Sequence, residues 1–170
     1  MKRNGGFTLI EVLIAMLVIV VGLLGVATMQ IASFQANQGA YARSQAVYLA
    51  QDILDRIRSN PKGFRDTSIY DAIDTSKDSD IPADPNCVTS TTGCTPLQMA
   101  QQDVREWSAN FSNVNGVDNY RPMLPNGRAQ LQRLGSANDF TATISWDEKD
   151  WSTANRVVQN RQISLTARLN

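Results

Sequence analysis

Residues 12–29 form an 18-residue segment, VLIAMLVIVVGLLGVATM, that contains no charged side chain. As an α-helix this segment would be about 27 Å long, which is close to the thickness of the hydrocarbon core of a bilayer. A helix that is apolar on every side must be surrounded by lipid or by a large protein core. The rest of a 170-residue chain is too small to surround it. The segment therefore predicts a membrane-spanning helix.

The charges that flank this segment predict its orientation. Lys2 and Arg3 precede it, and Glu11 is the only charged residue between Arg3 and Arg43. Because basic residues stay on the cytoplasmic side, we expect a cytoplasmic N-terminus and an exported remainder. A secretory signal peptide would carry a small-x-small cleavage site after the apolar run, and no clear site of that kind follows here.

The composition argues against several classes of function. The chain has 16 basic and 16 acidic residues, no histidine and two cysteines. Without histidine, Ser-His-Asp and Cys-His catalysis are excluded within this chain and the commonest zinc ligand is missing. The balanced charge argues against nucleic acid, and Arg156 and Arg161 are expected on opposite faces of the last strand. We expect no catalytic residue, no bound metal, no cofactor and no nucleic-acid partner.

A short motif precedes the apolar segment. Residues 2–6, KRNGG, are followed directly by residues 7–11, FTLIE. This arrangement resembles the type IV prepilin family, in which a short basic leader ends in glycine before an aromatic-led apolar run with one acid. The resemblance implies that a membrane prepilin peptidase cuts between Gly6 and Phe7 on the cytoplasmic side. It also implies N-methylation of Phe7, the new terminal residue.

Glu11 is an acid inside an otherwise apolar helix, where a charge costs a few kcal/mol and is functional by default. After cleavage it would lie four positions past the new amine at Phe7. The Glu11 carboxylate of one subunit could then pair with the terminal ammonium of a neighbour, and pairing offsets the desolvation of both groups. The resemblance implies that this assembly salt bridge sets the register of an incoming subunit. The alternative is a carboxylate that reaches the lipid headgroups from the end of the helix.

The helical pattern continues beyond the apolar segment, so we expect one helix from Phe7 to Arg58, ended by Pro61. Gly22 and Gly25 inside it are consistent with close helix packing and with local unwinding in a filament. An apolar row at spacings of 4, 3, 4 and 4 predicts one buried face: Ala42, Ala46, Leu49, Ile53 and Ile57. Three aromatic residues spaced by seven lie on an adjacent face: Phe34, Tyr41 and Tyr48. The polar face is expected to contact solvent or another subunit: Gln38, Arg43, Gln45, Gln51, Asp52, Asp55 and Arg56.

Two features occupy the connection that follows. Residues 63–85 contain six aspartates and few large apolar residues, which predicts a solvated acidic loop, with a weak cation site as the alternative. The spacing of the aspartates matches no EF-hand calcium loop. Cys87 and Cys94 enclose six residues, and an even pair in an exported domain predicts a disulfide. Two free thiols, or a redox or metal pair, are the alternatives.

The remaining residues predict a second helix and a sheet. Thr95 and Gln98 have the spacing of a capping box, and Pro96 takes the first helical position. A row at helical spacing is expected in the core: Leu97, Ala100, Val104, Trp107 and Phe111. Apolar and polar residues alternate in three segments that predict strands, with a hairpin connection beginning at Asp147: 128–134, 140–146 and 163–169.

Together these patterns predict an α+β fold, in which a long N-terminal α-helix packs on a small antiparallel β-sheet of three or four strands. The resemblance implies that this fold is type IV pilin-like. Four parts are expected along the chain. They are a leader peptide (1–6), a transmembrane and assembly half of the helix (7–30), an amphipathic half (31–60) and a periplasmic head (61–170).

Residues 22–30 and 46–61 resemble the minor pilins that are called type IV pilus modification proteins. The resemblance implies a minor-pilin complex in the inner membrane that primes pilus assembly, presents a tip adhesin and ends at the pilus tip on the cell surface. The implied partners are other minor pilins, the major pilin, the tip adhesin, prepilin peptidase, the inner-membrane assembly platform and, before assembly, membrane lipid. A minor pseudopilin of a type II secretion system is the alternative, because its leader looks the same. A membrane-anchored periplasmic enzyme is disfavoured by the missing catalytic constellation.

Overall fold

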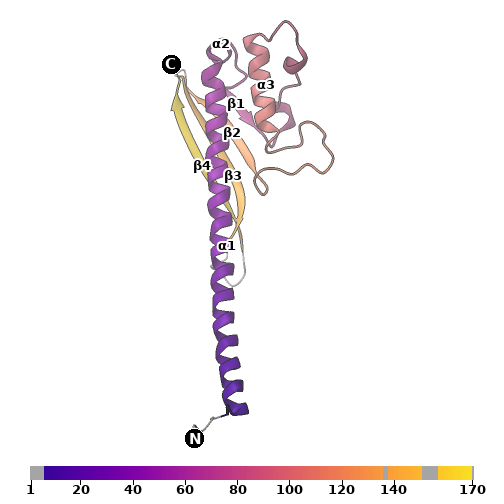
Figure 1. The fold of residues 1–170 in the computed structure, drawn as a ribbon. Coiled ribbons are helices and arrows are strands. Elements are labelled where there is room, and N and C mark those ends of the chain that lie inside the picture. Colours follow the sequence, from indigo (N-terminus) through magenta and orange to yellow (C-terminus); the bar gives the residue numbers. More distant parts are fainter. Residues whose placement is uncertain (1–5, 136–137, 151–156, 170) are drawn as a thin grey trace. The chain divides into compact units, whose positions relative to one another are not determined.

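The computed structural model describes residues 6–135, 138–150 and 157–169. The chain forms two compact units, Met1–Ala40 and Tyr41–Asn170. Helix α1 (Leu9–Ser59) begins in the first unit and ends in the second (Figure 1). It starts two residues later than predicted, at Leu9 instead of Phe7, and ends just before Asn60 and Pro61 as predicted.

In the first unit, the apolar length of α1 has no protein surface to pack against. Its most apolar 18-residue window has a mean hydropathy of 2.9, and none of that window is buried. Among the described residues, α1 is the one helix long and apolar enough to cross a membrane. Side chains of this kind are stable only in lipid or against other apolar helices.

The second unit contains a four-stranded antiparallel sheet with the order β1-β2-β3-β4, as the alternating segments predicted (Figure 1). Leu131 of β2 pairs with Ala142 of β3, and Ala142 pairs with Leu165 of β4. The connection between the antiparallel strands β3 and β4 begins after Lys149 and not at Asp147 as predicted, because β3 continues through Lys149 in register with β4. Arg156, predicted opposite Arg161, lies outside the described residues. The strands are β1 (Ala72–Asp74), β2 (Arg128–Leu134), β3 (Asp139–Lys149) and β4 (Val158–Arg168).

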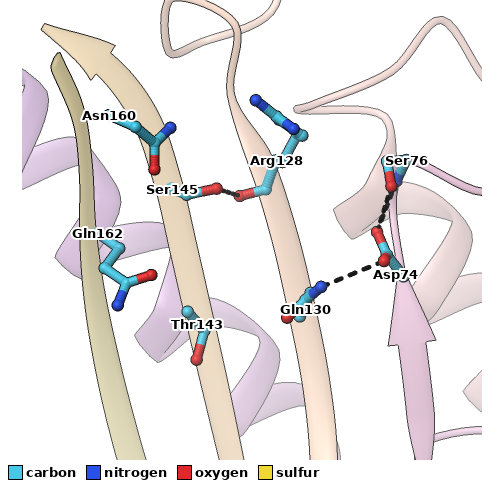
Figure 2. A pocket seen from close by; sticks show the side chains of 8 residues that line it. All are labelled: Asp74, Ser76, Arg128, Gln130, Thr143, Ser145, Asn160 and Gln162. Carbon is cyan, nitrogen blue, oxygen red and sulfur yellow. Dashed lines mark hydrogen bonds between the residues drawn. The ribbon is translucent and has the colours of Figure 1, made fainter.

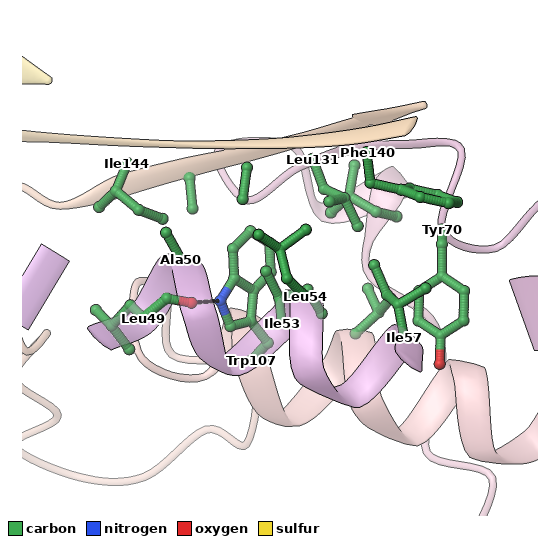
Figure 3. Packing of buried hydrophobic residues seen from close by; sticks show 14 of the residues in the cluster. Leu49, Ala50, Ile53, Leu54, Ile57, Tyr70, Trp107, Leu131, Phe140 and Ile144 are labelled. Atoms are coloured by element: carbon green, nitrogen blue, oxygen red, sulfur yellow. Dashed lines mark hydrogen bonds between the residues drawn. The ribbon is translucent and has the colours of Figure 1, made fainter. Parts of the chain in front are cut away.

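The core of the second unit lies between the sheet and the last part of α1. Four residues of the predicted row, Ala46, Leu49, Ile53 and Ile57, are fully buried, and Ala42 is partly buried. Figure 3 shows the α1 side chains directed toward Ile144, Leu131 and Phe140 of the sheet. Ala50 and Leu54 are also buried, so the buried face of α1 is wider than the predicted row.

Helix α3 (Pro96–Ser108) begins with the predicted capping box, in which Thr95 Oγ1 accepts a hydrogen bond from the Gln98 amide. Trp107 is fully buried, and its indole Nε1 donates a 2.8 Å hydrogen bond to the Leu49 carbonyl of α1 (Figure 3). Phe111 is buried just beyond the helix and packs edge-on against Trp107. The prediction for Leu97 is wrong: it is 43% exposed, because the first turn of α3 extends past the core.

Replacing Trp107 by alanine should therefore lower the free energy of unfolding by roughly 3–5 kcal/mol, the usual cost of removing a large buried aromatic side chain. Trp107→Phe is the matched control and should cost less, because it keeps an aromatic ring and loses the hydrogen bond to Leu49. Denaturant unfolding of the purified chain measures both values. Equal and small losses in the two variants would show that Trp107 does not hold α3 on α1.

The prediction of a solvated acidic loop after α1 is wrong for its apolar residues. Helix α2 (Pro61–Asp66), strand β1 and a 3₁₀ turn, η1 (Asp78–Asp80), lie in this segment. Phe64, Tyr70 and Ile73 are buried in the hydrophobic core of the second unit. Polar neighbours such as Arg65, Asp66 and Ser68 are exposed. The described residues contain no group of three His, Cys, Asp or Glu side chains that could hold a metal ion.

A polar cluster links α1 to α3, where the sequence predicted only an outward polar face. Arg56 forms ion pairs with Asp52 at 3.1 Å, with Glu106 at 2.8 Å and with Asp103 at 3.6 Å. The Tyr70 hydroxyl donates a 2.6 Å hydrogen bond to Asp103. Burial raises the pKa of Asp103, whereas hydrogen bonds from Gln102 and Arg56 lower the pKa of Glu106. Arg56, held on α1 by Asp52, therefore ties α1 to α3, and both side chains are only partly exposed.

Cys87 and Cys94 form a disulfide, as predicted, and their Cα atoms are 5.7 Å apart. The bridge closes an exposed loop that contains a 3₁₀ turn, η2 (Cys87–Thr89). Val88 in this loop is 83% exposed, so the loop packs little apolar surface. Gly93 has a φ of +78°, a backbone conformation that favours glycine. The bond, not packing, therefore holds the loop in shape.

Replacing both Cys87 and Cys94 by serine should lower the free energy of unfolding by about 2.5 kcal/mol, the chain-entropy value for so short a loop. Chemical denaturation of the wild-type chain with and without reductant provides the matched comparison. The reduced wild-type chain should unfold at the same denaturant concentration as the double serine variant. An unchanged midpoint in both would contradict a stabilising role for this bond.

Candidate functional site

The residues of the predicted processing site lie in an exposed, non-helical segment. Gly6, Phe7 and Thr8 precede α1 without regular structure, and the Phe7 side chain is 84% exposed. A Cβ atom built on Gly6 would meet no atom within 4 Å, and its backbone does not need the left-handed region. Nothing in the described fold thus requires glycine at this position. A requirement for glycine here would have to come from another molecule.

Glu11 lies in the first turn of α1, and its amide donates a 3.1 Å hydrogen bond to the Thr8 carbonyl. Thr8 and Glu11 have the Thr-x-x-Glu spacing of a capping box, a local signal that the sequence interpretation missed. A carboxylate in the first turn also interacts favourably with the helix dipole. These local effects explain an acid at a helix start, but they do not require one inside a membrane segment.

The Glu11 carboxylate makes no ion pair with any cation of the part of the chain that the structure describes. The residues around it are exposed apolar side chains, including Leu9, Ile10 and Leu13. In a lipid or helix-bundle environment, a carboxylate with these neighbours is destabilised unless a cation pairs with it. The structure therefore brings Gly6, Phe7 and Glu11 together in one exposed segment and leaves the acid available for a partner.

Gly22 and Gly25 lie further along the same helix, which is continuous through both. A Cβ atom on either would meet no atom within 4 Å, so packing within this chain explains neither glycine. Both interpretations of the sequence, close packing against other helices and local unwinding in a filament, concern contacts between molecules.

The outer face of the sheet has a shallow polar hollow of about 320 Å³ (Figure 2). It arises because the short side chains Thr143 and Ser145 of β3 lie between longer ones on β2 and β4. Gln130 donates to Asp74 there, and hydrogen bonds from Ser76 lower the pKa of Asp74, which is therefore ionised at neutral pH. The lining also holds one cation, Arg128, and the Ser76 hydroxyl donates a 2.6 Å hydrogen bond to Asp74. A carboxylate with a lowered pKa is a weak base, so this pair does not activate the hydroxyl as a nucleophile.

Comparison with known proteins gives two matches that lie side by side. The prokaryotic N-terminal methylation motif matches residues 1–27. The family described as type IV pilin Tt1218 matches residues 28–105, from the apolar part of α1 through most of α3. Searches of curated proteins and of solved structures found no match.

Proposed function

This chain is a type IV pilin, and from that premise we propose that it is a minor pilin of the kind called PilV. As a pilin it is a structural subunit that is anchored by an apolar N-terminal helix, processed by a prepilin peptidase and assembled with other pilins. The methylation motif joined without a gap to the pilin match supports the pilin assignment. The finer proposal rests on the similarity of residues 22–30 and 46–61 to minor pilins. We propose a structural role and no enzymatic one, since the pilin family that the chain matches is structural.

The proposed maturation begins with cleavage of the bond between Gly6 and Phe7. N-methylation of Phe7 follows, and the new terminal ammonium of one subunit pairs with the Glu11 carboxylate of its neighbour. The exposed non-helical bond and a carboxylate that makes no ion pair with another described residue support this sequence of steps. Residues 7–30 act in membrane anchoring and assembly, residues 31–60 join them to the head, and residues 61–170 make the exported head.

The proposed place of the subunit is a minor-pilin complex that primes pilus assembly and presents a tip adhesin. Lys2 and Arg3 support a cytoplasmic N-terminus and a periplasmic head in the inner membrane before assembly. The same chain then moves to the pilus, near its tip at the cell surface. The similarity of residues 22–30 and 46–61 to minor pilins supports this role over that of a major pilin.

Deletion of the chain tests this function against a pseudopilin role in type II secretion, whose leader is the same. We expect surface pili to fall by about tenfold or more, as for loss of a priming step worth over 1.4 kcal/mol, with secretion unchanged. Pili are counted after shearing and a secreted type II substrate is assayed in the medium. Re-expression of the wild-type chain should restore the pili. Normal pili with lost secretion would contradict the proposal and favour the pseudopilin.

A further inference from the structure

Strand β4 is the long free edge of the sheet. The strand order leaves β1 at one edge and β4 at the other, and β1 has three residues whereas β4 has eleven (Figure 1). Long edge strands are normally protected by proline, bulges, charged side chains or cover, because their unpaired backbone groups accept another strand. The segment 158–168, VQNRQISLTAR, contains neither proline nor glycine. No described segment pairs with its outer side.

The hydrogen bonds at the two ends of the β3–β4 ladder establish which backbone groups face outward. The Asp150 amide donates to the Val157 carbonyl, and the Leu169 amide donates to the Asn138 carbonyl. Because bonded and non-bonded pairs alternate in an antiparallel ladder, the odd-numbered residues of β4 bond to β3. The even-numbered residues direct their N–H and C=O groups to the free edge: Val158, Asn160, Gln162, Ser164, Thr166 and Arg168.

Apolar surface accompanies these free backbone groups. Ile163, Leu165 and Ala167 face the core but are only partly buried, whereas their β3 partners Ile144, Ala142 and Phe140 are fully buried. A fifth strand beside β4 would cover this strip and continue the existing core. The edge therefore offers both main-chain bonds and apolar contact.

Arg161 restricts what can bind. It has the same parity as Ile163 and Leu165, it is exposed, and it makes no ion pair with another described residue. A charge on the core-facing side of an edge strand opposes pairing with a purely apolar strand. A strand with a carboxylate beside Arg161 satisfies the charge and is preferred.

A second β4 strand does not fit the edge. Residues 158–168 contain no acidic residue, so a second β4 strand would bring no carboxylate to Arg161. Parallel pairing of two β4 strands would also turn the apolar side of one strand toward the polar outer face of the other sheet. A strand of a different protein that carries a carboxylate is therefore preferred.

We propose that the free edge of β4 docks an extended segment of a different protein of the assembly, which adds as a fifth strand. That segment carries apolar side chains beside Ile163 and Leu165 and a carboxylate beside Arg161. The docking is the same whether the filament is a pilus or a pseudopilus, so it extends beyond the proposed function.

The test places photoreactive benzoylphenylalanine at Gln162 of the full-length chain in cells that assemble the filament. Ser164→Pro removes an outward amide and leaves the bonds to β3, as prolines in edge strands do. Ser164→Ala is the matched control, because it keeps the amide and loses only the side-chain bond to Thr143. Thr166→Pro repeats the test at a second outward position, and thermal melting confirms that each variant folds.

We expect one adduct of fixed mass in the parent chain and in Ser164→Ala, reduced about tenfold or more in both proline variants, as for the loss of a docking contact worth over 1.4 kcal/mol. Arg161→Glu should reduce the same adduct, and Arg121→Glu, at an exposed position away from β4, should not. No adduct from residue 162, or an adduct that persists in the folded proline variants, would overturn the proposal. Because the adduct is scored in whole cells, it is read independently of whether the chain reaches sheared pili.

Discussion

Glu11→Ala and Glu11→Val chains are expected to be cleaved after Gly6 as the wild type is, yet to be nearly absent from sheared filaments. The carboxylate has no cation partner among the described residues, so its proposed partner is the Phe7 ammonium of a neighbouring subunit. Removing the acid leaves that ammonium unpaired in an apolar environment, at a cost of a few kcal/mol. Each 1.4 kcal/mol is about a factor of ten, so the recovered amount should fall about tenfold or more.

The measurement is the ratio of this chain in sheared filaments to the same chain in membranes, determined by immunoblot. Glu11→Gln keeps the size of the side chain and removes its charge, so it should behave as Glu11→Ala does. Asp66→Ala removes an exposed acid from α2 and should leave the ratio unchanged. Normal incorporation of the Glu11 variants would contradict the assembly salt bridge. Accumulation of their uncut precursor would assign the acid to processing instead.

Gly6→Leu is expected to stop maturation while the head folds normally. A Cβ atom at Gly6 would meet no atom within 4 Å, and residue 6 lies in an exposed segment before α1, so we expect the described fold to tolerate a side chain there. A peptidase pocket that accepts only glycine would reject it by steric clash, and cleavage should fall by about tenfold or more. The uncut chain should then accumulate in the membrane and be heavier than the mature chain by the leader, residues 1–6.

Gly22→Ala is the matched control, because a Cβ atom at Gly22 also meets no atom within 4 Å. It should be cleaved at the wild-type rate. Mass spectrometry of the membrane fraction separates cut from uncut chains. Efficient cleavage of the Gly6→Leu chain would contradict a processing site after Gly6, and equal blockage in both variants would show that the defect is not specific to that position.

Sequence periodicity predicted the parts of the fold that have long regular elements. The buried row on α1, the capped start of α3 and the three long strands all follow from spacing and capping signals. Strand β1 has only three residues, too few for alternation to be visible, and it forms because Ile73 packs beside Leu131. The ion pairs of Arg56 with α3 join residues about 50 positions apart, which local patterns cannot indicate.

The candidate site was predictable from a short sequence motif and not from periodicity. Gly6, Phe7 and Glu11 were identified from a motif, and that motif concerns a peptidase and a neighbouring subunit. The described fold explains neither a glycine at position 6 nor an unpaired acid in an apolar segment. The β4 edge was not predicted, because the sequence shows that a strand exists but not that it lies at the end of the sheet.

The most direct test of the central claim is mass spectrometry of the N-terminus of this chain, recovered by a C-terminal tag from sheared pili. We predict a chain that begins at Phe7, carries one methyl group on its terminal amine and co-purifies with a large excess of major pilin. A chain that keeps residues 1–6, or that is present in membranes and absent from sheared pili, would contradict the account.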